Sequence, residues 1–265
     1  MSDPKKFIAK AKQFNMVEKR QEDTSEFLEL ILPSKGLPYK DKNGNIPTTK
    51  IRPMRVKDEK LIAEMTGINF ESRFLQLLRN TVRGIDAKEM TIGDRLYCIL
   101  WLRINSYSSK YLIEFNCLSC NKKIMNEFNL AKLTILELAD DYHEPMTATL
   151  EDIGDTVQLR LLRVKDEMEI AQKMASGADD EWLLRYAYSM VNAMTVPEKL
   201  KYLNNLTSKD FSIIRGYQEI FNHGVDFKQT YTCPECEATE VLDIPFRPGL
   251  LVPEGSVIAS RNTYK

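Results

Sequence analysis

The sequence predicts an α+β fold that is internally duplicated, with two β-helix-β halves. Three observations predict it: a motif that occurs twice, helical and strand-like periodicities that follow each copy in the same order, and a CxxC pair near the end of each half. The chain has 265 residues, of which 43% are hydrophobic, so it can bury a substantial core. We therefore expect two related halves joined at their cysteines.

The repeated motif is the first sign of the duplication. Residues 51–65 read IRPMRVKDEKLIAEM and residues 159–173 read LRLLRVKDEMEIAQK, so RVKDE recurs at an offset of 108 residues. In both copies a strand-like stretch leads into a helical pattern, where Asp58 or Asp166 is expected to cap the new helix. Since neither copy is accompanied by a partner nucleophile or base, we interpret the motif as structural.

A second correspondence lies further along the chain. Thr91 and Thr207 each precede a helical pattern and are expected to be its N-cap. These threonines, and the CxxC pairs that follow them, are separated by 116 residues. The offset between corresponding residues rises from 108 at RVKDE to 116 at the threonines. We therefore predict an insertion of about eight residues in the second half, between residues 179 and 201, because loops tolerate added length.

The two CxxC pairs predict one shared metal site. In the reducing compartment expected for this chain, such pairs hold a metal more often than they form disulfides. Zinc binds four thiolates at about 2.3 Å, and two equivalent turns facing each other could supply two each. We therefore expect a structural zinc, with the alternatives of unmetalled pairs or a redox disulfide. The predicted ligands are Cys117, Cys120, Cys233 and Cys236.

The domain organisation follows from these repeats. We expect a docking segment at residues 1–26, a first α+β half at 27–135, a second half at 136–247, and an extended arm at 248–265. The arm has two prolines and apolar residues but no helical period, so it is expected to become ordered on a partner. Its deletion is expected to leave the body folded and to weaken partner binding.

The charge balance and hydropathy argue against several function classes. A formal net charge of −1 gives no global attraction to nucleic acid or anionic lipid. No run of eighteen apolar residues predicts a membrane span, and the N-terminus lacks the apolar core of a secretion signal. We expect a soluble chain that stays in the cytoplasm where it is made, with neither nucleic acid nor membrane as a partner.

Enzyme signatures are also missing from the sequence. It contains no phosphate loop, GxGxxG, GxSxG or HExxH motif. His143 lies in an acidic connector and His223 at an expected helix end, so neither is a credible catalytic base. Cys98 is expected on an apolar helix face as a buried small side chain. We predict no catalytic residue and no small-molecule substrate.

Several motifs together resemble a known family. They are FLELILPSKGLPY at residues 27–39, the VKDE helix entry, a helix beginning TIGDR, and a strand that leads into CxxC. In this order they resemble the T4-type baseplate hub family of contractile-tailed phages, best over residues 27–130 and more loosely to about residue 247. The family comprises hub subunits and hub assembly factors.

The resemblance implies a role, partners and a location. The role is that of a structural component or assembly factor in the hub or wedge region of a contractile tail baseplate. Other baseplate and tail proteins are the implied partners. The implied location is the tail baseplate of the virion, with assembly in the host cytoplasm.

The sequence is compatible with two other functions, which its residues favour less. A zinc-ribbon module of a phage transcription or packaging complex would bind nucleic acid, but the charges beside the two cysteine turns differ in sign. Lysines flank the first turn, whereas Glu235, Glu237 and Glu240 flank the second. A zinc hydrolase ranks lowest, because four thiolates leave no open position for water.

Overall fold

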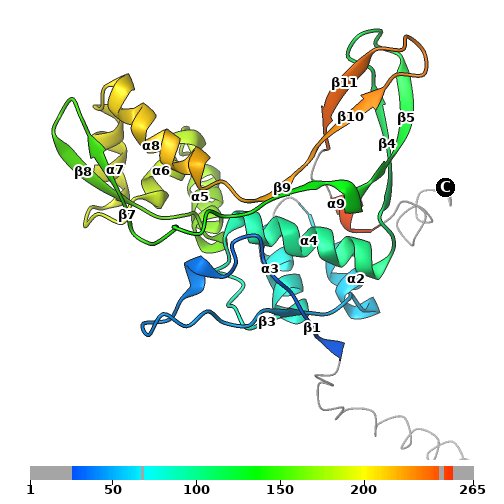
Figure 1. The fold of residues 1–265 in the computed structure, drawn as a ribbon, viewed down its shortest axis with the longest axis horizontal. Coiled ribbons are helices and arrows are strands. Elements are labelled where there is room, and N and C mark those ends of the chain that lie inside the picture. The colour runs from blue at the N-terminus through cyan, green and yellow to red at the C-terminus, as the bar shows by residue number, and fades with distance from the viewer. Residues whose placement is uncertain (1–25, 67–68, 245–247, 253–265) are drawn as a thin grey trace, which may run out of the picture.

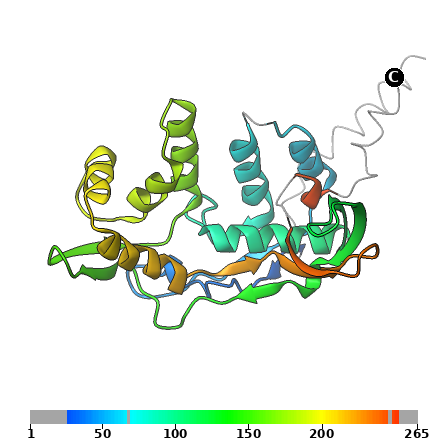
Figure 2. The same ribbon diagram turned by 90° about the horizontal axis from the view of Figure 1, so that it is seen from above.

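A computed structural model describes residues 26–66, 69–244 and 248–252. Helices and short strands are mixed along the chain, which confirms the α+β class. Two helical bodies lie side by side, and two β-hairpins project together from one end of the molecule (Figures 1 and 2). No helix in the described ranges has the length and hydrophobicity needed to span a bilayer.

The first half combines a small sheet, three α-helices and a hairpin. Strands β1, β2 and β3 form an antiparallel three-stranded sheet, and β4 pairs with β5. The elements are β1 Leu28–Glu29, a 3-10 turn Leu37–Tyr39, β2 Lys50–Ile51, α2 Val56–Ala63, α3 Phe70–Thr81, β3 Val82–Arg83, α4 Ile92–Ser106, β4 Lys110–Asn116, β5 Lys123–Asn129, a 3-10 turn Leu130–Lys132, and β6 Thr134–Leu136.

The second half has a similar order of elements. A β7–β8 hairpin precedes four helices, and β10 pairs with β11. Strand β9 pairs with β6, which joins the two halves. The elements are β7 Met146–Leu150, β8 Asp155–Leu159, α5 Val164–Ala175, α6 Glu181–Ser189, α7 Val196–Asn204, α8 Ser208–Ile220, β9 Gly224–Asp226, β10 Lys228–Thr232, β11 Thr239–Asp243, and the terminal α9 Pro248–Leu251.

The two halves differ mainly by helix α7. Helices α3 and α6 end 108 residues apart, at Thr81 and Ser189, whereas α4 and α8 begin 116 residues apart, at Ile92 and Ser208. The extra length therefore lies between α6 and α8, where α7 is found. This position overlaps the C-terminal part of the interval in which the insertion was expected.

The threonine caps lie where the sequence predicts them. The Thr91 hydroxyl accepts a hydrogen bond from the N–H of Asp94 at 3.3 Å, and Thr207 accepts one from Asp210 at 3.1 Å. Both threonines have extended backbone and precede α4 and α8 directly. Each satisfies an N–H that the first helical turn leaves without a partner.

The aspartates of RVKDE act differently from the prediction. Asp58 and Asp166 are the third residue of α2 and α5, and the N-cap itself is an arginine. Each carboxylate accepts the N–H of this arginine, at 2.8 and 2.7 Å. It also pairs with a second arginine, Arg52 or Arg160, which directly follows the preceding strand, so the carboxylate is held in the first turn of the helix.

The C-terminal region also differs from the expected extended arm. Residues 248–251 form a short helix, and Leu250, Leu251 and Val252 are buried. Leu250 packs in the cluster under the cysteine hairpins, and the other two pack against the helices of the first half. Burial of three apolar side chains favours this helix although the sequence has no helical period. The arm after residue 252, and the docking segment before Glu26, lie outside the described residues.

Candidate metal centre

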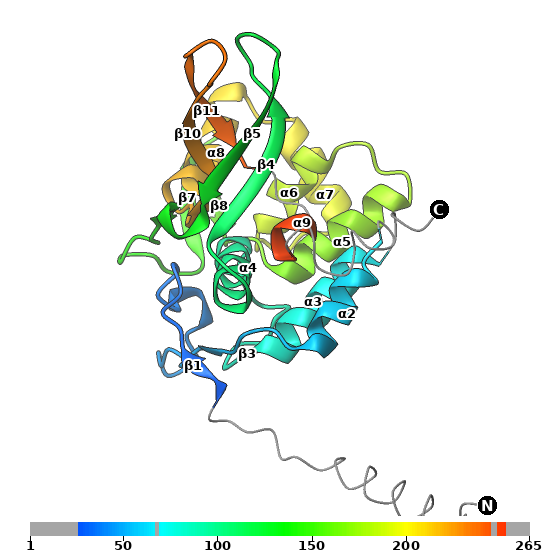
Figure 3. The same ribbon diagram turned by 90° about the vertical axis from the view of Figure 1, so that its right-hand side faces the viewer.

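The two CxxC pairs lie in the turns of the two projecting hairpins. The last pair of β4–β5, Asn116 with Lys123, encloses CLSCNK, and the last pair of β10–β11, Thr232 with Thr239, encloses CPECEA. The two hairpins lie next to each other with their turns at the same end (Figures 1 and 3). The fold therefore brings together pairs that are 116 residues apart.

Both turns have the same backbone geometry. The N–H of Cys117 and that of Cys233 each donate to the carbonyl five residues later, at 2.9 Å. Asn121 and Glu237 each return an N–H to the first cysteine of their turn, at 2.9 and 3.0 Å. Both also have positive φ, 56° and 58°, which is uncommon for residues with a side chain. The same local chain path thus presents each pair of thiols.

The four sulfurs form one compact cluster. All four lie within 4.8 Å of one another, with Cys117 and Cys236 3.8 Å apart and Cys120 and Cys233 3.9 Å apart. A tetrahedron of sulfurs at about 2.3 Å from zinc has edges of about 3.8 Å. A disulfide is much shorter, at about 2.05 Å, and all four cysteines are free. The cluster therefore has the spacing of a metal-binding thiolate set, and it could bind a metal ion.

The pKa values of Cys117 and Cys236 are shifted in opposite directions. Hydrogen bonds from the N–H groups of Cys120 and Ser119 lower the pKa of Cys117 to about 7. The N–H of Ala238 donates to the Cys236 sulfur and lowers its pKa. Desolvation and hydrogen bonds with the other three thiols together outweigh this effect and raise the pKa to about 12. Adjacent thiols share protons because neighbouring thiolates repel, and a divalent cation removes that repulsion.

Glu240 joins the second hairpin to the turn of the first. Its carboxylate accepts hydrogen bonds from the N–H of Leu118 at 3.2 Å, from the Tyr231 hydroxyl at 2.5 Å, and from the Ser119 hydroxyl. The Ser119 and Tyr231 donors lower the pKa of Glu240. Tyr231 also packs edge-on against Phe115 at 4.8 Å. The supporting role of Glu240 was not visible in the sequence.

The lysines beside the first turn are paired with acids. Lys122 contacts Glu235 of the other hairpin at 2.6 Å, and Lys123 contacts Glu114 of its own hairpin at 2.8 Å. Opposite charges therefore meet across the two hairpins at Lys122 and Glu235. This pairing leaves little excess positive charge beside the cysteines.

The remaining candidate residues lie away from the cluster. His143 is exposed, whereas His223 is buried and its Nε2 lies 2.7 Å from the Thr91 hydroxyl, at the junction of the two halves. Cys98 is fully buried, as expected, and burial raises the pKa of its thiol. None of the three belongs to the four-sulfur group.

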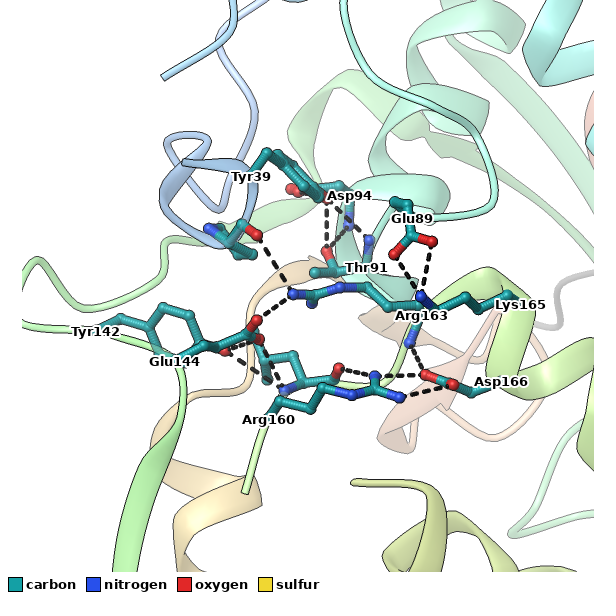
Figure 4. Close-up of polar contacts among 12 residues, drawn as sticks. Tyr39, Glu89, Thr91, Asp94, Tyr142, Glu144, Arg160, Arg163, Lys165 and Asp166 are labelled. Carbon is teal, nitrogen blue, oxygen red and sulfur yellow. Dashed lines mark hydrogen bonds and ion pairs between the residues drawn. The ribbon is translucent and has the colours of Figure 1, made fainter. Parts of the chain in front are cut away.

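A second polar cluster lies at the junction of the halves (Figure 4). Arg163 is buried and donates to Glu144 at 2.5 Å, while Arg160 makes two hydrogen bonds to Asp166, at 2.6 and 2.8 Å. The sequence predicted a structural role for RVKDE but not this contact with the connector at Glu144. Contacts this distant in the chain leave no local pattern.

The first half completes this junction. The Tyr39 hydroxyl donates to Asp94 at 2.5 Å and accepts the N–H of Thr91 at 2.8 Å, and Lys165 of the second half contacts Glu89 at 2.7 Å. A pocket of about 470 Å³ opens beside these groups, but its basic side chains are largely paired with acidic ones. The cluster therefore ties the halves together.

Comparison with known proteins gives one family. A family model described as "T4 bacteriophage base plate protein" matches residues 28–245, which is most of the chain and includes all four cysteines. No curated protein and no solved structure matches the sequence. The match confirms the resemblance drawn from the LPSKGLPY, VKDE, TIGDR and CxxC motifs, and it extends through both halves.

Proposed function

The chain belongs to the family of T4 bacteriophage base plate proteins, and from this premise we propose that it is a zinc-stabilised, non-catalytic component or assembly factor of a contractile tail baseplate. Its place is in the hub or wedge region, where it binds other tail proteins. The observation that carries the proposal is the four-sulfur cluster, to which each half contributes one CxxC turn. Such a site stabilises a fold and does not need a substrate.

The proposed zinc holds two elements that are weak alone. A two-stranded hairpin is at best marginally stable by itself in water. Metal bound only by the folded chain adds its binding free energy to folding. A bridge between Cys117 and Cys233 also closes a long loop, and it thereby restricts the unfolded chain. The ligands in this proposal are Cys117, Cys120, Cys233 and Cys236.

The ligand set favours a structural ion over a catalytic one. A catalytic zinc keeps one position for water or substrate, whereas four thiolates fill the tetrahedron. The paired lysines beside the first turn likewise favour the structural role over the nucleic-acid module. We place the protein in the virion tail, with assembly in the host cytoplasm.

We also infer that the halves arose by duplication. The arginine–aspartate pairs Arg52–Asp58 and Arg160–Asp166 recur at an offset of 108. The threonine caps and the cysteine turns recur at 116, with the same hydrogen bonds in each copy. Duplication of one ancestral half explains why the two halves share side-chain contacts as well as the order of their elements.

The test combines elemental analysis with sedimentation. We expect about one zinc per purified chain, and co-sedimentation with purified tail particles. Cys117→Ser should lose the zinc, whereas Cys98→Ala, which changes a buried cysteine outside the cluster, should keep it. Wild-type chain without metal would refute the zinc site. Zinc without co-sedimentation would instead favour an assembly factor that leaves the particle.

A further inference from the structure

The two halves contact each other through different faces. The second half uses the start of α5, residues 163–168, which we call the leading face. There the N–H of Val164 donates to the carbonyl of Met90 at 2.9 Å, and that of Lys165 donates to the carbonyl of Lys88 at 3.0 Å. Val164 is only 1% exposed. Val164 of the leading face is thus covered by the first half, whereas Lys165 and Glu167 are only partly buried.

The first half contributes what we call the receiving face, built from residues 88–91, Phe74 and Arg95. Phe74 is 1% exposed, and the guanidinium of Arg95 lies 5.5 Å from its ring centre. Arg95 also pairs with Glu167 of α5 at 2.5 Å. Val164 of the second half and Phe74 of the first therefore belong to one buried apolar cluster.

Each face has an equivalent that is uncovered. Val56 at the start of α2 corresponds to Val164, and it is 69% exposed. Trp182 on α6 corresponds to Phe74, and it is 55% exposed although it contacts Tyr186 and Phe211. Helix α2 belongs to the first helical body, whereas α6 belongs to the second, where it lies between α5 and α7 (Figure 1). A second leading face and a second receiving face thus remain open.

We propose that a second copy of this chain covers them, with the leading face of one copy, at Val56, packed on the receiving face of the next, at Trp182. Two different faces that pair in this way form a heterologous contact, which produces rings or open chains of copies. The occupant is a second copy because Val56 and Trp182 are exposed at the positions equivalent to Val164 and Phe74, which the chain buries in one apolar cluster. The inference rests on the correspondence of the halves, not on zinc or on the baseplate role.

The contact between copies is expected to be weaker than the internal one. Within the chain, the backbone at Gly224 approaches Gly93 so closely that a Cβ on Gly93 would lie 2.2 Å from the carbonyl oxygen of His223. The residue equivalent to Gly93 is Lys209, whose side chain excludes that approach. The contact is therefore restricted to the start of α2 and the aromatic side chains on α6 and α8. We expect reversible association that depends on concentration.

Sedimentation velocity of the zinc-loaded chain over a range of concentrations tests the proposal. Wild-type chain should form dimers and larger species. Val56→Asp should weaken association about tenfold or more, and it should fold because an acidic residue suits the first helical position. Trp182→Glu should have the same effect through the other face. Val241→Asp is the matched control, since Val241 is 56% exposed on a hairpin strand remote from both faces.

Mixing the two variants separates this arrangement from other kinds of self-association. Val56→Asp keeps its receiving face, and Trp182→Glu keeps its leading face. At a concentration where each variant alone is monomeric, an equimolar mixture should therefore form a dimer and nothing larger. A wild-type chain that remains monomeric at every concentration would overturn the proposal. So would a mixture that does not associate, or a control that dissociates as fully as Val56→Asp does.

Discussion

The cysteine hairpins and the helical bodies are stabilised in different ways. The hairpins are two-stranded, and their tips meet through four sulfurs and the hydrogen bonds of Glu240. The helical bodies have larger apolar clusters, and the first contains a buried Arg52–Asp58 pair. A bound metal should therefore matter most at the hairpins, whereas packing and buried charge should matter most in the helices.

Removal of the metal should have the largest effect, and it should be local. Structural zinc in small peptides contributes an apparent 10–16 kcal/mol, roughly, to folding, which is far more than the Glu240 hydrogen bonds and the exposed Lys122–Glu235 pair contribute at the hairpin tips. With a chelator we expect hydrogen exchange to accelerate in residues 110–129 and 228–243. Residues 70–81 of α3 should stay protected, because their core is separate. Uniform loss of protection would show that hairpins and helices form one cooperative unit.

Truncation of the C-terminal helix should weaken both regions. Leu250 packs under the hairpins, while Leu251 and Val252 pack on the first helical body. Loss of three buried apolar side chains should cost roughly 5 kcal/mol. A chain ending at residue 247 should therefore melt far below one ending at residue 252, as measured by thermal unfolding. Equal melting temperatures would restore the earlier expectation that the body does not need this segment.

The difference between these regions also shows how far the sequence could predict the structure. The cysteine cluster was predictable, because two equal turns at one offset indicate that four cysteines meet. The caps at Thr91 and Thr207 were predictable for a similar reason, since capping depends on neighbours in the chain. Local patterns therefore predicted local contacts and, through the repeat, one distant contact.

Features decided by tertiary packing could not be predicted in this way. Helix α9 is too short to show a period, and only the clusters that receive Leu250 and Leu251 explain it. The RVKDE copies are identical, yet Val164 is buried and Val56 is exposed. Two identical motifs cannot indicate which of them is buried at the junction, because burial depends on whether the other half of the chain packs against the motif.

The smallest predicted effect is a difference in stability between variants of the arginine–aspartate pairs in the two helical bodies. Asp58 and its partner Arg52 are both buried, whereas Arg160, the partner of Asp166, is 21% exposed. Asp58→Asn leaves a buried guanidinium without its counter-charge and should cost about 3 kcal/mol. Asp166→Asn should cost about 1 kcal/mol, because water can still solvate Arg160. Urea unfolding of the two variants measures this difference, and equal costs would contradict it.

Acid titration sharpens the same comparison. Burial raises the pKa of Asp58, but the Arg52 side chain and the N–H of Arg55 outweigh it, so the folded-state pKa is lowered. A lowered pKa contributes stability that is present above the unfolded value of about 3.9 and is lost as the pH falls toward the folded value. Wild-type chain should therefore lose this contribution below about pH 4, and Asp58→Asn should show a shallower acid dependence. An unchanged slope in Asp58→Asn would mean that other carboxylates control acid unfolding, and that the buried pair contributes to packing alone.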